Sequence, residues 1–196
     1  INMVEKIYPE LIPNLSTCRS PQMMMGPLIK TFWAKKMNIN PDQIFQVSMM
    51  PCVAKKAEIE RHQLLRDGKK DVDAVLTTRE FGKLLHMQGI VDWDTVKEME
   101  YDNPLGESTG AAVLFANSGG VMEAALCIAY EIITGTPLPK LDLTMVRGLE
   151  DTREATIKVG DLDLKVAVVT GGRNVRKLIK KIQESPVKPL YHFVEV

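Results

Sequence analysis

The residues most suited to chemistry lie in one loop, where a thiol, an ammonium and a carboxylate are spaced three residues apart. Cys52, Lys55 and Glu58 belong to the sequence MPCVAKKAE, residues 50–58, which follows a β-type run at 44–50 and opens a helical pattern. This order predicts that Cys52 lies at the carboxyl tip of a strand, where open α/β sheets bind their ligands. A thiol at a helix N-terminus beside lysines is biased toward the thiolate, the form that binds metal.

The alternative for Cys52 is a buried structural cysteine, which is the usual fate of a lone free thiol. Pro51 and the strand-tip position favour a metal or redox role instead. Cys127 lies within an apolar helical pattern and indicates a core residue, whereas Cys18 lies in a turn and its role is open. A four-iron cubane needs about four thiolates. Three scattered cysteines cannot supply them, so the partners of a cluster bound by Cys52 would lie outside this chain.

Two glycine loops raise the possibility of an anion site. Asn117-Ser-Gly-Gly120 precedes a helical pattern and could hold an anion on backbone amides. It lacks the lysine and hydroxyl residue of a P-loop, so a tight strand-to-helix turn is the alternative. The segment Thr170-Gly-Gly172 has the same two interpretations.

These loops sit in a pattern that alternates strands with helices. The expected strands are 44–50, 72–77, 111–115 and 191–196, with a hairpin of 156–159 and 162–169 that turns at Gly160-Asp161. The expected helices are 55–65, 78–87, 121–133 and 174–182, with Thr77 or Thr78 as the N-cap of the second. Such alternation predicts an α/β protein with largely parallel pairing and right-handed crossovers. The polar stretch 91–108 is expected to be a surface excursion or a junction between lobes.

Composition excludes some classes of protein. The formal net charge of zero argues against a nucleic-acid binder, and no apolar run approaches the roughly 20 residues of a membrane span. Three widely spaced cysteines without CxxC pairs argue against a disulfide framework and favour a reducing compartment or a metal-binding role. No signal-peptide pattern is present, and we expect a cytoplasmic protein. The chain starts at Ile1 inside an amphipathic pattern and ends on a strand-like run. We therefore expect it to be a piece of a longer protein.

Three segments together resemble the catalytic domain of the large subunit of iron–iron, or iron-only, hydrogenases. They are LSTCRSPQ at 15–22, MPCVAKKAE at 50–58 and FANSGGVMEAA at 115–125. The MPCxxKxxE pattern is the most specific, and the likeness covers essentially the whole chain. The resemblance implies an α/β fold of two lobes, each with a small, mainly parallel sheet flanked by helices, and a cluster cleft between them. It also implies reversible reduction of protons to hydrogen at an H-cluster, a 4Fe-4S cubane bridged by a cysteine to a two-iron centre with carbonyl and cyanide ligands.

The same resemblance implies that residues 1–196 are a single fragment of that domain, truncated between the first and third of its three cysteine motifs. The bridging cysteine, two other cubane ligands and a proton-shuttling cysteine would then lie outside the chain. We expect the isolated fragment to lack the H-cluster and to be inactive.

The family's functional residues match a defined set of positions. Cys52 matches a cubane iron ligand, Lys55 the lysine that bonds a cyanide, and Ser16 a serine of the proton path. The apolar wall of the pocket is matched by Met50, Phe115 and Val121, and the turn beside the two-iron centre by Ser20, Pro21 and Gln22. Glu58 matches the glutamate of the motif, without an assigned chemical step.

The expected partners are the rest of its own chain and an electron-transfer partner such as a ferredoxin or an NAD-linked subunit, with no nucleic acid and no membrane span. Two alternatives stay open. One is a hydrogenase-like iron–sulfur assembly or sensory protein without turnover. The other is an α/β nucleotide-binding module that uses Asn117–Gly120.

Overall fold

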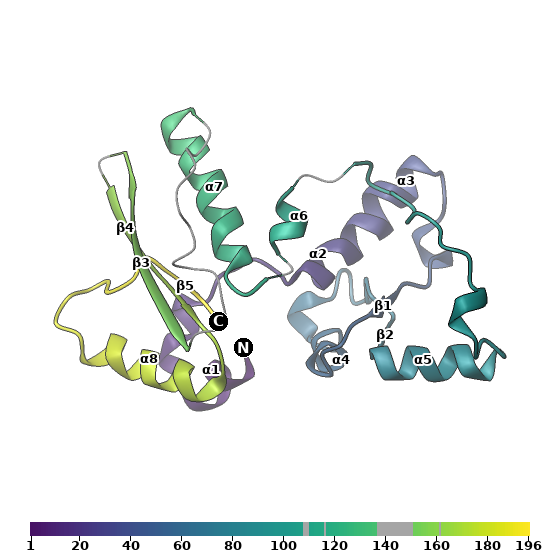
Figure 1. The fold of residues 1–196 in the computed structure, drawn as a ribbon, viewed down its shortest axis with the longest axis horizontal. Coiled ribbons are helices and arrows are strands. Elements are labelled where there is room, and N and C mark those ends of the chain that lie inside the picture. Colours follow the sequence, from purple (N-terminus) through teal and green to yellow (C-terminus); the bar gives the residue numbers. More distant parts are fainter. Residues whose placement is uncertain (108–109, 116, 137–150, 161) are drawn as a thin grey trace. The chain divides into compact units, whose positions relative to one another are not determined.

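The computed structural model describes residues 1–107, 110–115, 117–136, 151–160 and 162–196. They form two compact units, an N-terminal unit (Ile1–Gly106) and a C-terminal unit (Glu107–Val196), shown in Figure 1. The N-terminal unit holds a two-stranded sheet and the C-terminal unit a three-stranded sheet, and both combine their sheet with helices. This mixture of helices and small sheets confirms the expected α/β class.

The N-terminal unit contains short elements. Its helices are α1 (Asn2–Ile7), α2 (Pro21–Leu28), the π-helical η2 (Ile29–Trp33), α3 (Ala34–Lys36), α4 (Ala54–Glu58) and α5 (Thr78–Met87). Its 3-10 turns are η1 (Pro9–Asn14), η3 (Pro41–Gln43), η4 (His62–Leu64) and η5 (Trp93–Thr95), and its strands are β1 (Val47–Met49) and β2 (Ala74–Leu76). The two strands pair in parallel, with Ser48 opposite Val75.

The core of this unit lies where α2 meets the sheet. Met23 of α2 is buried with Ile59, Val72 and Val75, and Met50 packs against them. Gly26 permits the close approach, because a Cβ there would stand 2.9 Å from a methyl carbon of Val72.

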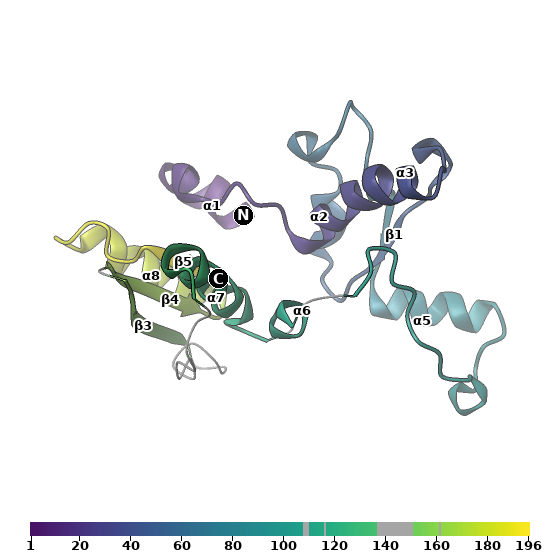
Figure 2. The same cartoon turned by 90° about the horizontal axis from the view of Figure 1, so that it is seen from above.

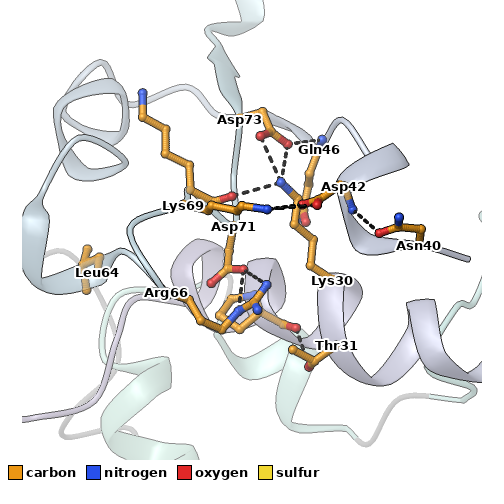
Figure 3. Close-up of polar contacts among 12 residues, drawn as sticks. Lys30, Thr31, Asn40, Asp42, Gln46, Leu64, Arg66, Lys69, Asp71 and Asp73 are labelled. Carbon is orange, nitrogen blue, oxygen red and sulfur yellow. Dashed lines mark hydrogen bonds and ion pairs between the residues drawn. The ribbon is translucent and has the colours of Figure 1, made fainter.

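An ion pair between the buried Lys30 and the partly exposed Asp73 connects η2 to the sheet (Figure 3). Lys30 of η2 reaches the Asp73 carboxylate at 2.7 and 2.9 Å, and its ammonium also donates to the Lys70 carbonyl oxygen at 3.0 Å. Asp73 accepts a further hydrogen bond of 2.7 Å from the backbone N–H of Gln46, just before β1. One carboxylate therefore connects a helix, the start of β1 and the start of β2.

The C-terminal unit is a three-layer arrangement. Its elements are α6 (Ala111–Leu114), α7 (Gly120–Thr134), β3 (Thr152–Val159), β4 (Leu162–Val169), α8 (Gly172–Glu184) and β5 (Phe193–Glu195). β4 pairs antiparallel with β3 and parallel with β5, so this sheet is mixed rather than mainly parallel. Figure 2 shows α7 and α8 beside the sheet. The buried side chains alternate along β3, and α7 contributes Met122 and Leu126 to the core formed with Ile157, Val166 and Val168.

Most of the expected elements are present, with shifted ends. The helix 78–87 and the strand 162–169 have the expected bounds, and β3 is longer than expected. β1, β2 and β5 are shorter, and the helix expected to reach residue 65 ends at Glu58. Asp161 and Ala116 of the two expected turns, and Ser108, lie outside the described residues.

The expected strand 111–115 is wrong, because residues 111–114 form helix α6. A short apolar run does not distinguish a buried strand from a helix, and the two alanines favour the helix. The stretch 91–108 contains only the short turn η5 among its described residues, and the boundary between the two units falls within it. In the part of the chain that the structure covers, we find no helix with the length and apolarity needed to cross a bilayer.

We expect Asp73→Ala to lower the free energy of unfolding of the N-terminal unit by about 3–5 kcal/mol, because it leaves the Lys30 ammonium buried without its counter-ion. Asp42→Ala is the matched control, since its pair with Lys69 is exposed on both sides, and it should cost at most about 1 kcal/mol. Urea denaturation followed by tryptophan fluorescence measures both, because Trp33 and Trp93 are the two tryptophans of the chain. Equal losses in the two variants would contradict this role for Asp73.

Candidate metal centre

Cys52 lies at the tip of β1, as the sequence predicted. Met50, directly after the strand, donates its N–H to the Leu76 carbonyl oxygen at 2.8 Å, and this bond extends the sheet by one residue. Cys52 follows two residues later with an exposed thiol that is in no disulfide. The N–H of Lys55 donates to the Cys52 carbonyl oxygen at 3.2 Å as α4 begins. The thiol is therefore presented by a strand-to-helix turn and is open to a ligand.

Lys55 is held by its neighbour on α4. Its ammonium lies 2.8 Å from a carboxylate oxygen of Glu58, and the two side chains are 27% and 20% exposed. A half-buried ammonium three residues after the exposed Cys52 is a donor suited to an anionic ligand.

The first turn of α2 lies against the same loop. Ser20 is the N-cap of α2, and its hydroxyl oxygen accepts from the N–H of Met23 at 3.4 Å. Pro21 follows and is exposed, whereas Gln22 is 4% exposed and its amide donates to the Lys55 carbonyl oxygen at 3.4 Å. The other amide atom, Gln22 Oε1, is buried without a hydrogen-bond partner among the described residues. The structure thus brings together Gln22 and Lys55, which belong to segments that are separate in sequence.

Ser16 is exposed in the turn before α2. Its hydroxyl oxygen accepts from the N–H of Cys18 at 3.1 Å, which leaves its own proton available for donation. Within the described residues, no hydrogen bond links Ser16 to Gln22 or to the Cys52 loop.

Phe115 and Val121 belong to the C-terminal unit and flank the turn that joins α6 to α7. They are 43% and 39% exposed. Gly119 has φ +88°, and a Cβ on Gly120 would stand 1.6 Å from the Leu114 carbonyl oxygen, so both glycines are required by the turn. The structure therefore supports the tight-turn interpretation of Asn117–Gly120, although the turn joins two helices rather than a strand and a helix.

The backbone amides of this turn already hold an anion. The Glu195 carboxylate accepts from the N–H of Gly119 at 2.9 Å and from the N–H of Met122 at 2.7 Å. A nucleotide phosphate would have to displace this carboxylate, which argues against the nucleotide-binding alternative. Arg153, 5% exposed, braces the turn from β3, with a guanidinium nitrogen 2.8 Å from the Ser118 hydroxyl.

Sequence reasoning missed Glu195 and Arg153, although both support the turn beside Phe115 and Val121. Arg153 lies before the strand that was expected at 156–159 and carried no local signal. Glu195 carried none, because its partners lie more than seventy residues away.

The side chains around Cys52 fit part of an iron–sulfur centre. A thiolate is the ligand that such clusters use, and a lysine ammonium beside it can bond an anionic ligand of the metal. In the described ranges, no group of three or more His, Cys, Asp or Glu side chains is placed to hold a metal ion. The residues present here therefore fit one thiolate ligand of a cluster and the polar lining beside it.

Comparison with known proteins decides the family. The whole chain, residues 1–196, matches the model of the iron only hydrogenase large subunit, C-terminal domain. The chain belongs to this family. The periplasmic [Fe] hydrogenase large subunit of Nitratidesulfovibrio vulgaris is 45% identical over 191 residues, which cover 97% of this chain and 45% of that protein.

One further relative and one solved structure are also similar to this chain. The cytosolic iron-sulfur assembly component 3 of Mus musculus is 33% identical over 196 residues, covering 95% of this chain and 40% of that protein. A structure of a variant of apo [FeFe]-hydrogenase HydA1 from Chlamydomonas reinhardtii has a TM-score of 0.78 and 39% identity, over 98% of this chain and 55% of that one. The chain spans less than half the length of the Nitratidesulfovibrio vulgaris and Mus musculus proteins. A further similar structure, with 39% identity and a TM-score of 0.77, is that of HydA(deltaEFG) in [FeFe]-hydrogenase H-cluster assembly, which agrees with the H-cluster that the resemblance implied.

Helix α4 is anchored to α5 by a second charged contact. Lys56 reaches Glu80 at 2.5 Å, and Glu80 also accepts from the N–H of Thr77 at 2.8 Å, which completes a capping box. The hydrogen bond from Lys56, followed by those from Thr77, lowers the pKa of Glu80 from 4.5 to about 2. The helix that carries Lys55 is thereby tied to the start of the next helix.

Because the pKa of Glu80 is depressed in the folded chain, its contribution to stability is complete above about pH 4.5 and is lost as the pH falls toward about 2. We expect Lys56→Ala to raise the midpoint of the Glu80 titration toward 4.5, as measured by NMR of the side-chain carboxyl carbon. A midpoint unchanged in Lys56→Ala would show that Lys56 does not hold this carboxylate.

We expect alkylation of the thiols to modify Cys52 before Cys127. Cys52 is exposed, whereas Cys127 is half-buried against the core of the C-terminal unit. Timed treatment with iodoacetamide followed by peptide mapping measures the order, and exposed Cys18 serves as the reference for an accessible thiol. Modification of Cys127 ahead of Cys52 would contradict the accessible strand-tip position.

Proposed function

We propose that this chain is part of the catalytic domain of an iron-only hydrogenase that reversibly reduces protons to hydrogen at an H-cluster. The observation that carries the proposal is the strand tip at which the exposed Cys52 thiol precedes the half-buried Lys55 ammonium, in a chain that matches the family over its full length. The H-cluster supplies the redox chemistry when it is bound. The residues described below bind it and move protons.

Cys52 would hold one iron of the cubane as a thiolate, and the remaining thiolates would come from the rest of the parent protein. Lys55 would turn its ammonium from Glu58 toward a cyanide ligand of the two-iron centre, where a charge-assisted hydrogen bond is strong in a dry pocket. Gln22 fixes the backbone of Lys55 through its 3.4 Å hydrogen bond. Ser20 and Pro21 set the turn at the start of α2, and Met50 would provide apolar lining. Phe115 and Val121 of the C-terminal unit match further apolar positions of the family's pocket.

Ser16 would take part in proton delivery. Its oxygen accepts the hydrogen bond from Cys18 while its own proton is available, and a relay needs a group that can both accept and donate. It touches no metal in this assignment. Its loss should therefore affect proton transfer and leave the cluster in place.

The partner would be an electron carrier, such as a ferredoxin or an NAD-linked subunit. The relative from Nitratidesulfovibrio vulgaris is named as a large subunit, which supports assembly with other chains. We propose a cytoplasmic location on the basis of the free, widely spaced cysteines, although that relative is named as periplasmic.

The second candidate is an iron–sulfur assembly protein without hydrogen turnover. It is supported by the 33% identity to the mouse assembly component, over 95% of this chain. The two candidates differ in one observable, since the hydrogenase alone requires a two-iron centre with carbonyl and cyanide ligands.

In the full-length protein, we expect Lys55→Ala to prevent stable binding of the two-iron centre. It leaves an anionic ligand unpaired in a dry pocket, at a cost of about 2–5 kcal/mol. We expect Ser16→Ala to retain the cluster and to slow hydrogen evolution by about a hundredfold or more. Iron content, the infrared bands of carbonyl and cyanide, and hydrogen evolution are measured for each variant.

Two exposed residues provide the controls. Lys69→Ala removes an ammonium of the same unit that pairs with Asp42 on the surface, and Thr17→Ala removes the exposed hydroxyl beside Ser16. Both should retain the infrared bands and the rate. A Lys55→Ala protein with normal bands would refute the role of Lys55, and a wild-type protein without such bands would favour the assembly protein.

A further inference from the structure

Helix α7 begins without a side-chain cap of its own. Its N-cap is Gly119, which has no side chain and adopts a left-handed conformation. The first N–H groups of a helix need acceptors, and a negative charge there is stabilised by the helix dipole. In this chain, the acceptor is the Glu195 carboxylate from the far end of the sequence.

The two carboxylate oxygens of Glu195 accept hydrogen bonds from two different backbone N–H groups. Oε1 accepts from the N–H of Gly119 at 2.9 Å, and Oε2 accepts from the N–H of Met122 at 2.7 Å. Since Gly119 and Met122 stand on either side of Gly120 and Val121, the two hydrogen bonds fix the backbone of the first helical turn. Val121 leaves this turn with its side chain 39% exposed.

Glu195 is also the last residue of β5. That strand has three residues and lies beside β4, with Glu195 opposite Val168. At the beginning of β5, His192 exchanges two hydrogen bonds with Lys165, of 2.7 and 2.9 Å. At its end, the Glu195 side chain joins the strand to α7.

We propose that Glu195 is a positioning residue for the metal pocket, because it locks the first turn of α7, which carries Val121, to the end of β5. This inference rests on the proposed function, which assigns Phe115 and Val121 to the apolar lining of the pocket. Arg153 of β3 contacts the same turn through the Ser118 hydroxyl. Glu195 connects the turn to β5.

Two substitutions at Glu195 distinguish the effect of its hydrogen bonds from the effect of its side-chain volume. Glu195→Gln keeps one oxygen acceptor and presents an NH₂ group to the second backbone N–H, so it should retain about half of the tie. Glu195→Ala removes both acceptors. Glu154→Ala is the matched control, because Glu154 is a glutamate of the same sheet whose carboxylate pairs with Lys181 on α8.

The first measurement is hydrogen exchange of the full-length protein prepared without its cluster, which is independent of hydrogenase activity. We expect the amides of Gly119 and Met122 to exchange at least about tenfold faster in Glu195→Ala, since each loses its acceptor. Glu195→Gln should fall between this variant and wild type, and Glu154→Ala should match wild type. Unchanged protection at both amides in Glu195→Ala would overturn the proposal. If Glu195→Ala does not fold, the Glu195→Gln protein provides the test.

The second measurement is the infrared spectrum of the same proteins after loading of the H-cluster. We expect shifted or broadened carbonyl and cyanide bands in Glu195→Ala, with partial recovery in Glu195→Gln and wild-type bands in Glu154→Ala. Faster amide exchange with wild-type bands and rate would make Glu195 a helix cap alone and overturn the positioning role. Failure of the proposed function is distinguishable, because the bands would then be missing from wild type as well.

Discussion

The N-terminal unit depends on the ion pair between Lys30 and Asp73. Two strands of three residues form few backbone hydrogen bonds, so their register needs support from side chains. Removing an ion pair from water is costly unless its remaining donors and acceptors are satisfied. Here three acceptor oxygens lie within 3.0 Å of the Lys30 ammonium nitrogen, and Asp73 also accepts from the N–H of Gln46. This contact sets where β1 begins relative to β2, and therefore where the strand delivers Cys52.

In the C-terminal unit, Glu195 likewise supports a short strand. Its last strand is also three residues long, and again a carboxylate accepts backbone N–H groups from a segment distant in sequence. Asp73 is matched by a cation, whereas Glu195 is matched by the N-terminal dipole of α7. In both units the carboxylate connects a short strand to a helix. These contacts fix the loops at the ends of the short strands, although the strands themselves form few backbone hydrogen bonds.

Local signals predicted structure well where the stabilising contacts are local. Helix α5 has its expected bounds because Thr77 and Glu80 form a capping box within four residues, and the β3–β4 hairpin follows from alternating apolar residues. The strand-tip position of Cys52 was predictable for the same reason. Helix α6 was mistaken for a strand because its apolar run has no periodicity of either kind. The contact of Gln22 with Lys55 and the role of Glu195 depend on tertiary packing, which a single sequence does not encode locally.

The polar groups of the candidate site differ from those of the scaffold in how fully they are satisfied. Lys30 and Asp73 are saturated with partners, whereas the Cys52 thiol is exposed and Gln22 Oε1 is buried without a partner in the described part of the chain. A buried acceptor left without a donor costs about 1–3 kcal/mol. Natural proteins accept such local costs where function requires them. An N–H or O–H donor brought to Gln22 Oε1 would recover this energy and would therefore stabilise the contact between α2 and the backbone of Lys55 at the start of α4.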